Sequence, residues 1–126
     1  MADISPLIPE GRQVVQKYGA GRFTITGHVH EGAVIVFPER TLVWDLGPDG
    51  RVTEESLAPV FAAAARVDIL LIGAGPTFTP PPGPLRKALK ASGIVMDWMD
   101  TGAACRTYNV LMGEDRAVAA ALIAID

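Results

Sequence analysis

Apolar residues in the first third of the chain come in short runs that glycine and proline interrupt. Four runs have the length and composition of strands: 14–18, 23–26, 34–37 and 41–44. The turn residues Gly19, Ala20 and Gly21 separate the first two runs, and this spacing is typical of a β-hairpin. Pro38 ends the third run. We therefore expect an antiparallel hairpin region, preceded by a loose arm over residues 1–9.

A helical period replaces this pattern after Val52. Thr53 is a good N-cap residue, and two glutamates follow it, where the helix dipole favours negative charge. The apolar residues that follow recur at the spacing of one helix face: Leu57, Val60, Phe61 and Ala64. We predict a helix from Thr53 to about Ala65. Pro59 lies inside it and has no backbone N–H, so regular hydrogen bonding should be restricted to the part after it.

The middle of the chain alternates between strand and helix signals. Ile69–Ile72 is a short apolar run, typical of a strand that is covered on both faces. A proline-rich loop leads to a short helix, Leu85–Lys90, which we expect to end at Gly93. Ile94–Met99 is the next strand. This order predicts a βαβ unit with parallel strands and a right-handed crossover.

The final segment, 116–125, is rich in alanine and suits a helix as well as a strand. We predict a strand over Val118–Ile125, because its larger apolar residues leave both faces apolar, as a central strand requires. The expected fold class is therefore α/β, with three layers, a mixed central sheet that contains the parallel βαβ unit, and the N-terminal antiparallel hairpin region.

Composition restricts the size of the fold and the classes of partner. The chain has 126 residues, of which 49% are hydrophobic and 20% charged, so we expect one domain over residues 1–126 with one core. The net charge of −3 does not indicate the basic patch that phosphate binding requires, which argues against binding of nucleic acid. No signal peptide or apolar run long enough for a membrane span is recognisable. The single cysteine cannot form a disulfide within the chain, which fits a reducing compartment. We expect a cytoplasmic protein.

The segment from Asp100 to Arg116 gathers most of the chemically distinctive residues of the chain. It contains the only cysteine, Cys105, together with Arg106, an asparagine and a tyrosine between two apolar runs. Thr101 should cap a helix of about three turns, and Gly113 should end it in a left-handed conformation.

The run MDTGAACRTYNVLMGEDR resembles the signature of a family that shares an uncharacterised domain. This family includes mitochondrial complex I assembly factor 3 and the adipogenesis-associated protein. The resemblance implies a closing strand antiparallel to the parallel ones, and a module linked to the assembly of respiratory complexes rather than a known reaction. Two positions depart from the family: Ala74 stands where threonine is usual, and Asp115 replaces a glycine.

A crevice beyond the carboxyl ends of the two parallel strands is the expected place for a ligand. One strand ends at Gly73-Ala74-Gly75 and the other at Asp100, and the following helix begins at the same edge. The candidate residues of this crevice are Gly73, Gly75, Thr101, Cys105, Arg106 and Asn109. The alternative is that they are structural, with Cys105 buried and Arg106 tying neighbouring segments together; we favour the structural role for Arg106. Glu114 and Arg116 are expected to form an ion pair at the corner that follows.

No cofactor or metal is predicted. The pair His28 and His30 would face one side of a strand, but no third metal ligand is recognisable nearby. The glycines at 73 and 75 do not form a dinucleotide motif, because Pro76 follows at once and Phe78 stands where the third glycine should be.

Two functions from different classes remain open. The first is a non-enzymatic interaction or assembly module, a monomer or weak dimer, with Trp44, Phe78 and Trp98 as exposed anchors for a protein partner. The second is a small-molecule-binding protein or small enzyme that uses the crevice, which requires that Cys105 be reachable from solvent. The sequence favours the first, because no general base is placed beside the thiol.

Overall fold

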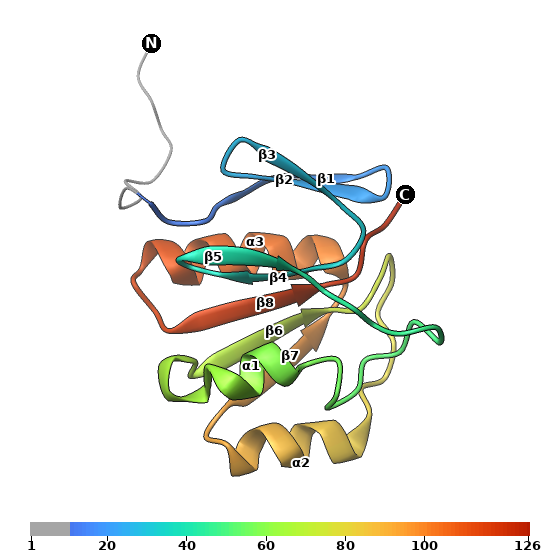
Figure 1. The fold of residues 1–126 in the computed structure, drawn as a ribbon, viewed down its shortest axis with the longest axis vertical. Coiled ribbons are helices and arrows are strands. Elements are labelled where there is room, and N and C mark those ends of the chain that lie inside the picture. The colour runs from blue at the N-terminus through green and yellow to red at the C-terminus, as the bar shows by residue number, and fades with distance from the viewer. Residues whose placement is uncertain (1–10) are drawn as a thin grey trace.

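The computed structural model describes residues 11–126, and the expected loose arm at 1–9 lies outside this range. Within the described residues, eight strands form two sheets, in the orders β1-β2-β3 and β5-β4-β8-β6-β7 (Figure 1). The strands are β1 (Val15–Gly19), β2 (Arg22–Ile25), β3 (His28–Glu31), β4 (Val34–Phe37), β5 (Arg40–Val43), β6 (Ile69–Gly73), β7 (Val95–Met99) and β8 (Val118–Leu122). The helices are α1 (Ala58–Ala62), the 3-10 turn η1 (Ala64–Arg66), α2 (Gly83–Ala91) and α3 (Thr101–Gly113).

The predicted antiparallel hairpins are confirmed. β1 and β2 pair antiparallel around the two residues Ala20 and Gly21, and β2 and β3 pair antiparallel around Thr26 and Gly27. All four turn residues have positive φ, which matches the twist of the flanking strands. The third hairpin, β4 and β5, joins the larger sheet and not the small one.

The larger sheet is mixed, and the predicted parallel βαβ unit is formed by β6, α2 and β7. The predicted final strand is also formed, although β8 ends at Leu122. Its expected direction relative to the parallel strands is wrong: β8 runs antiparallel to β4 and parallel to β6. The reason is that α3 carries the chain back along the sheet between β7 and β8, and a strand entered through such a helical crossover runs parallel.

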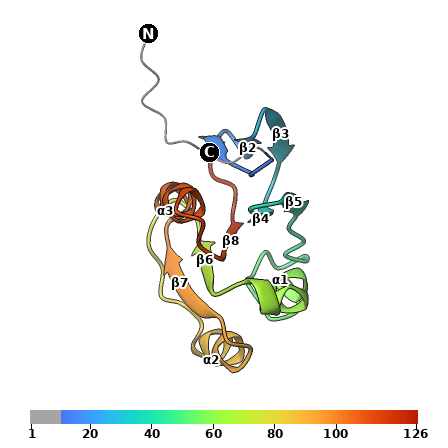
Figure 2. The ribbon, with the colours of Figure 1, turned by 90° about the vertical axis from the view of Figure 1, so that its left-hand side faces the viewer.

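Alternate side chains of the central strands point to opposite faces of the larger sheet, which gives three layers. Figure 2 shows α3 on one side of the sheet and α1 on the other. The small sheet packs with α3, and α2 packs against β7 on the same side of the sheet as α1. The cluster on the α3 side includes Phe23, Val34, Val36, Leu71, Tyr108, Ala120 and Leu122. The cluster on the other side includes Ile35, Phe37, Val60, Leu70, Ile72, Leu85, Leu89 and Ala121.

The helix predicted from Thr53 to Ala65 is shorter than expected. Regular helix begins only at Ala58, and Pro59 lies in its first turn. The preceding residues form a turn in which the Ser56 N–H donates to the Thr53 hydroxyl oxygen at 3.0 Å. The expected effect of Pro59 is therefore confirmed, because proline fits the first turn, where no helical N–H bond is required.

Candidate functional site

The expected crevice begins at the junction of β6 with α3. Asp100 is the N-cap of α3, and its carboxylate accepts a hydrogen bond from the Ala103 N–H at 2.9 Å. The expectation that Thr101 caps the helix is therefore wrong. Thr101 is fully buried; its hydroxyl accepts from the Gly75 N–H at 3.1 Å and donates to the Ile123 carbonyl at 2.7 Å. This side chain joins the segments that follow β6 and β8.

Gly73 lies against the first turn of α3 with no room for a side chain. A Cβ atom added to Gly73 would be 2.9 Å from the Thr101 Cα and 3.2 Å from the Ala104 Cβ. The Thr101 N–H also donates to the Gly75 carbonyl at 2.8 Å. The structure thus brings Gly73, Gly75 and Thr101 together, but as a packed junction in which the protein itself occupies the space.

Cys105 lies one turn further along α3, on the face that packs against the sheet. Its side chain is 2% exposed and belongs to the apolar cluster on the α3 side. Burial raises the pKa of the thiol from 9.0 to about 12; the charge of Arg106 opposes this rise and that of Asp100 adds to it. The thiol is therefore neither reachable nor activated, as the structural alternative requires.

Asn109 and Arg106 contact the small sheet and not a ligand site. The Asn109 side chain donates to the Val15 carbonyl at 2.8 Å and accepts from the Val15 N–H at 3.0 Å. Arg106 is exposed and donates from Nη1 to the Tyr18 hydroxyl at 3.0 Å. That hydroxyl lies over Gly102, where an added Cβ would come within 2.7 Å of it. Arg106 thus ties α3 to β1, as a structural role implies, but not from a buried position.

The corner after α3 is held by backbone groups. Asp115 has φ of 61°, and its N–H donates to the Met112 carbonyl at 3.0 Å, while the Arg116 N–H donates to the Leu111 carbonyl at 3.0 Å. This pattern is a Schellman motif, with the aspartate in the left-handed position predicted for Gly113. Within residues 11–126, Glu114 and Arg116 do not form the expected ion pair, and Asp115 pairs instead with Arg12 at 2.9 Å.

A cavity does open at the carboxyl edge of the parallel strands, but on the α2 side of the sheet. It has a volume of about 430 Å³ and is lined by residues at the ends of three strands, Ala74, Trp98 and Ile123. Two prolines of the loop before α2 and the segment 50–53 complete it. The Trp98 indole N–H donates to the Thr79 hydroxyl at 3.3 Å, and Phe78, in the same loop, is 66% exposed.

The expectation of three exposed aromatic anchors is wrong: Phe78 is exposed, but Trp98 is half-buried and packs against the core, and Trp44 is buried. Its side chain is 3% exposed, and its indole N–H donates to the Ser56 carbonyl at 2.9 Å. The reason is that Trp44 follows β5 directly and fills the core between the sheet and α1.

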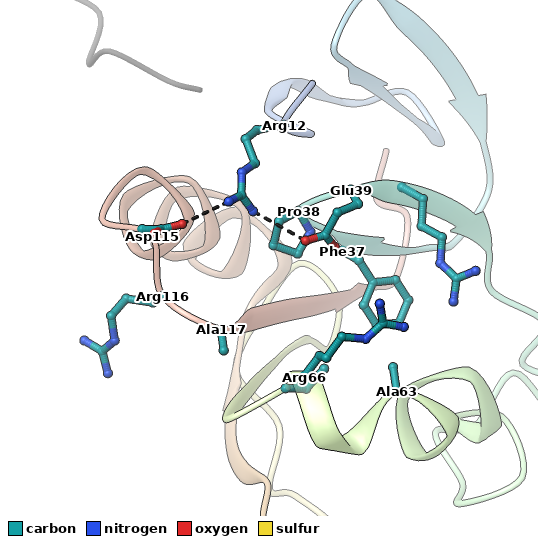
Figure 3. A pocket seen from close by; sticks show the side chains of 11 residues that line it. Arg12, Phe37, Pro38, Glu39, Ala63, Arg66, Asp115, Arg116 and Ala117 are labelled. Carbon is teal, nitrogen blue, oxygen red and sulfur yellow. Dashed lines mark hydrogen bonds and ion pairs between the residues drawn. The ribbon is translucent and has the colours of Figure 1, made fainter. Parts of the chain in front are cut away.

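A second cavity lies at the opposite end of the sheet, and sequence reasoning missed it. It has a volume of about 480 Å³ and lies between the β4–β5 turn, the end of η1 and the corner after α3 (Figure 3). The residues that line it include four arginines, and we call it the arginine pocket: Arg12, Phe37, Pro38, Glu39, Arg40, Ala63, Arg66, Val67, Asp115, Arg116 and Ala117. No local motif marks it, because its arginines come from four distant parts of the chain.

The two histidines lie on the small sheet. His28 is exposed and His30 half-buried on β3. Nowhere in residues 11–126 do three His, Cys, Asp or Glu side chains come together in a group that could hold a metal ion.

Nearly all of the described chain, from the start of β1 to the residue after β8, matches one known family. The match covers residues 15–123 and is to the DUF498/DUF598 family of proteins of unknown function. The chain belongs to this family. The family resemblance that the sequence around α3 suggested is therefore confirmed.

The relatives of this chain include a bacterial protein and an animal assembly factor. An uncharacterised protein of Rhodobacter capsulatus is 37% identical over 113 residues, which are 90% of this chain and 86% of the relative. NADH dehydrogenase (ubiquinone) 1 alpha subcomplex assembly factor 3 of Danio rerio is 32% identical over 110 residues, which are 87% of this chain. This chain covers only 63% of that assembly factor's length.

A solved structure has the same fold. It is described as the crystal structure of an outer membrane protein from Bartonella henselae, with a TM-score of 0.84 and 39% identity over 92% of this chain and 98% of that one. In the present protein, none of the helices in residues 11–126 has the length and apolar character needed to span a bilayer.

Proposed function

We propose that this DUF498/DUF598 protein is a non-enzymatic interaction module that helps to assemble a larger protein complex. The observation that carries the proposal is the carboxyl-edge surface, where exposed Phe78 stands in the loop that borders the apolar cavity of Trp98. Exposed aromatic side chains beside a hollow are typical anchors for a protein partner. The relationship to assembly factor 3 supports a link to the assembly of respiratory complexes.

The alternative, a small-molecule-binding protein or small enzyme at Gly73, Gly75, Thr101, Cys105 and Arg106, has less support. Thr101 uses its hydroxyl for internal hydrogen bonds, and the Cys105 thiol is buried with a raised pKa. A thiol nucleophile needs both access and a lowered pKa. A cytoplasmic location and a monomer or weak dimer are parts of the same proposal.

The test is capture of partners by the tagged full-length chain in its own cells, measured by quantitative mass spectrometry. We expect a specific set of proteins with the wild type, and its loss in a Phe78→Ala, Trp98→Ala double variant. The matched control is Val29→Ala, because Val29 is 60% exposed on β3 and lies outside the carboxyl edge.

Three results would count against the proposal. A wild-type chain that captures nothing above the level of an untagged control contradicts an interaction module. Equal capture by the wild type and the double variant, with folding checked by circular dichroism, contradicts the carboxyl edge as the docking surface. Sedimentation at micromolar concentration that shows a tight tetramer would contradict the expected oligomeric state.

A further inference from the structure

The arginine pocket combines a cationic rim with an apolar wall. Arg12, Arg40, Arg66 and Arg116 line it with only two carboxylates, those of Glu39 and Asp115. The chain as a whole has a net charge of −3, so this end of the sheet concentrates positive charge against an acidic background. A concave site with one prevailing sign of charge attracts ligands of the opposite sign.

Both carboxylates of the pocket are already paired with the same arginine. Arg12 Nη2 is 2.9 Å from Asp115 Oδ1, and its Nη1 is 3.5 Å from Glu39 Oε1 (Figure 3). Arg12 is thereby fixed between the β4–β5 turn and the corner after α3. Within the described residues, no carboxylate lies within 4.0 Å of the guanidinium groups of the other three arginines. These three groups therefore keep their capacity to bind an external anion.

The wall beneath the arginines is apolar and consists of nearly buried side chains. The side chains of Phe37, Ala63 and Val67 are 4%, 7% and 2% exposed and belong to the core between the sheet and α1. The Arg40 guanidinium lies over the Phe37 ring, 5.3 Å from its centroid. A guanidinium supported on an aromatic face is held in position while its N–H groups remain directed to its edges.

We infer that the arginine pocket is a docking site for an acidic, partly apolar segment of a partner protein. This inference rests on the proposed function and names a second surface for it. Carboxylates of the segment would bind Arg40 and Arg66, and an adjacent apolar side chain would contact the lining beside Phe37. Arginine suits this role because its planar N–H groups match a carboxylate in a bidentate geometry.

A segment of a protein fits these features better than a small inorganic anion does. The cavity of about 480 Å³ is far larger than one inorganic anion needs, and its arginines come from separate elements around it. An inorganic anion would also make no use of the apolar lining of the pocket, whereas a peptide side chain can contact this lining while its carboxylates bind the arginines.

The test uses photo-crosslinking in cells with the full-length chain. The photoreactive residue p-benzoylphenylalanine is introduced at Ala117, which lines the pocket, or at Val95, which is 65% exposed on β7 outside it. We expect position 117 to crosslink to partner segments that are rich in Asp and Glu and contain an apolar residue. We expect no such enrichment at position 95.

A charge-reversal pair then tests the arginines. Arg40→Glu with Arg66→Glu should lower crosslinking at position 117 by about tenfold or more, since like charges across an interface repel each other. The matched control is Lys87→Glu with Lys90→Glu, which makes the same change in net charge at exposed positions of α2. This control should leave the crosslinks intact.

The outcomes separate the two proposals. If the wild type captures partners but crosslinks at position 117 are absent, not acidic, or unchanged by the arginine pair, the pocket inference is wrong and the interaction module stands. If the wild type captures no partner at all, the proposed function itself fails. Binding of inorganic pyrophosphate in calorimetry, without acidic crosslinks, would make the pocket a small-anion site and would also overturn the inference.

Discussion

The side-chain amide of Asn109 pairs with both backbone groups of Val15, at 2.8 Å and 3.0 Å. An asparagine of α3 thus takes the place of a strand partner at the start of β1. The β1–β2 register shifts between Val15 and Lys17, next to this contact. The helix that carries the family signature therefore also holds the small sheet in place.

Removal of this contact should destabilise the protein. Asn109→Ala leaves the N–H and carbonyl of the buried Val15 without partners, so we expect a loss of about 1–3 kcal/mol in the free energy of unfolding. Denaturant melts measure this loss. Val110→Ala is the control, because Val110 is 59% exposed and should cost less than about 0.5 kcal/mol. Equal midpoints for the two variants would show that the amide contact adds nothing.

The Gly73 contact predicts a second sensitive position. Gly73→Ala places a methyl group 2.9 Å from the Thr101 Cα, and because this neighbour is backbone it cannot move aside cheaply. We expect a loss of about 1–3 kcal/mol in thermal or denaturant melts. Gly113→Ala meets open space at the end of α3 and should be neutral or slightly stabilising. A Gly73→Ala variant as stable as the Gly113→Ala variant would contradict this close packing.

Arg106 should contribute little to stability despite its place in the signature. It is exposed, and its hydrogen bond goes to Tyr18, which is 40% exposed. Arg106→Ala should therefore change the free energy of unfolding by less than about 1 kcal/mol. A double-mutant cycle with Tyr18→Phe measures the pair directly. A coupling energy of several kcal/mol would mean that the contact is protected from solvent in a way the structure does not show.

Burial of Cys105 predicts a loss of stability at alkaline pH. The folded state raises the pKa of the thiol from 9.0 to about 12, so the stability that the neutral thiol contributes is complete below pH 9 and is lost as the pH rises toward 12. Between about pH 8 and pH 10 the wild type should lose roughly 1.4 kcal/mol more than Cys105→Ala. Denaturant melts across this range test the difference, and parallel curves for the two proteins would exclude it.

The first hairpin turn offers a stabilising substitution. Ala20 has φ of 54°, a conformation that alanine adopts at a cost, and Ala20→Asn should gain about 0.5–1 kcal/mol because Asn-Gly suits this turn. Thr26 has φ of 47° in the second turn, but its hydroxyl accepts from the Val14 N–H at 2.8 Å. Thr26→Asn should therefore give no gain. Melting temperatures compare the two, and a gain at Thr26 that matched Ala20 would refute the role of the hydroxyl.

The sequence by itself determined the elements whose signals are local. Apolar runs predicted β4, β6 and β7, and glycine turns predicted the first hairpin. Candidate capping residues at its two ends predicted α3, although Asp100 and not Thr101 is the N-cap, and the signature predicted the family. Pro59 predicted where regular hydrogen bonding in α1 begins, because the missing N–H acts within one turn. These features depend on neighbouring residues, so a single sequence contains the information needed to find them.

The tertiary structure alone decided the direction of β8, the closure of the crevice and the arginine pocket. The direction of β8 follows from the path of α3 over the sheet. The apolar pattern of the strand would be the same in either direction, so it does not indicate which one is formed. The crevice is closed because α3 packs directly on Gly73. This contact joins residues that are far apart in the chain, so no local pattern reveals it. The arginines of the pocket come together only when the ends of four separate segments meet, and each alone is an ordinary surface residue.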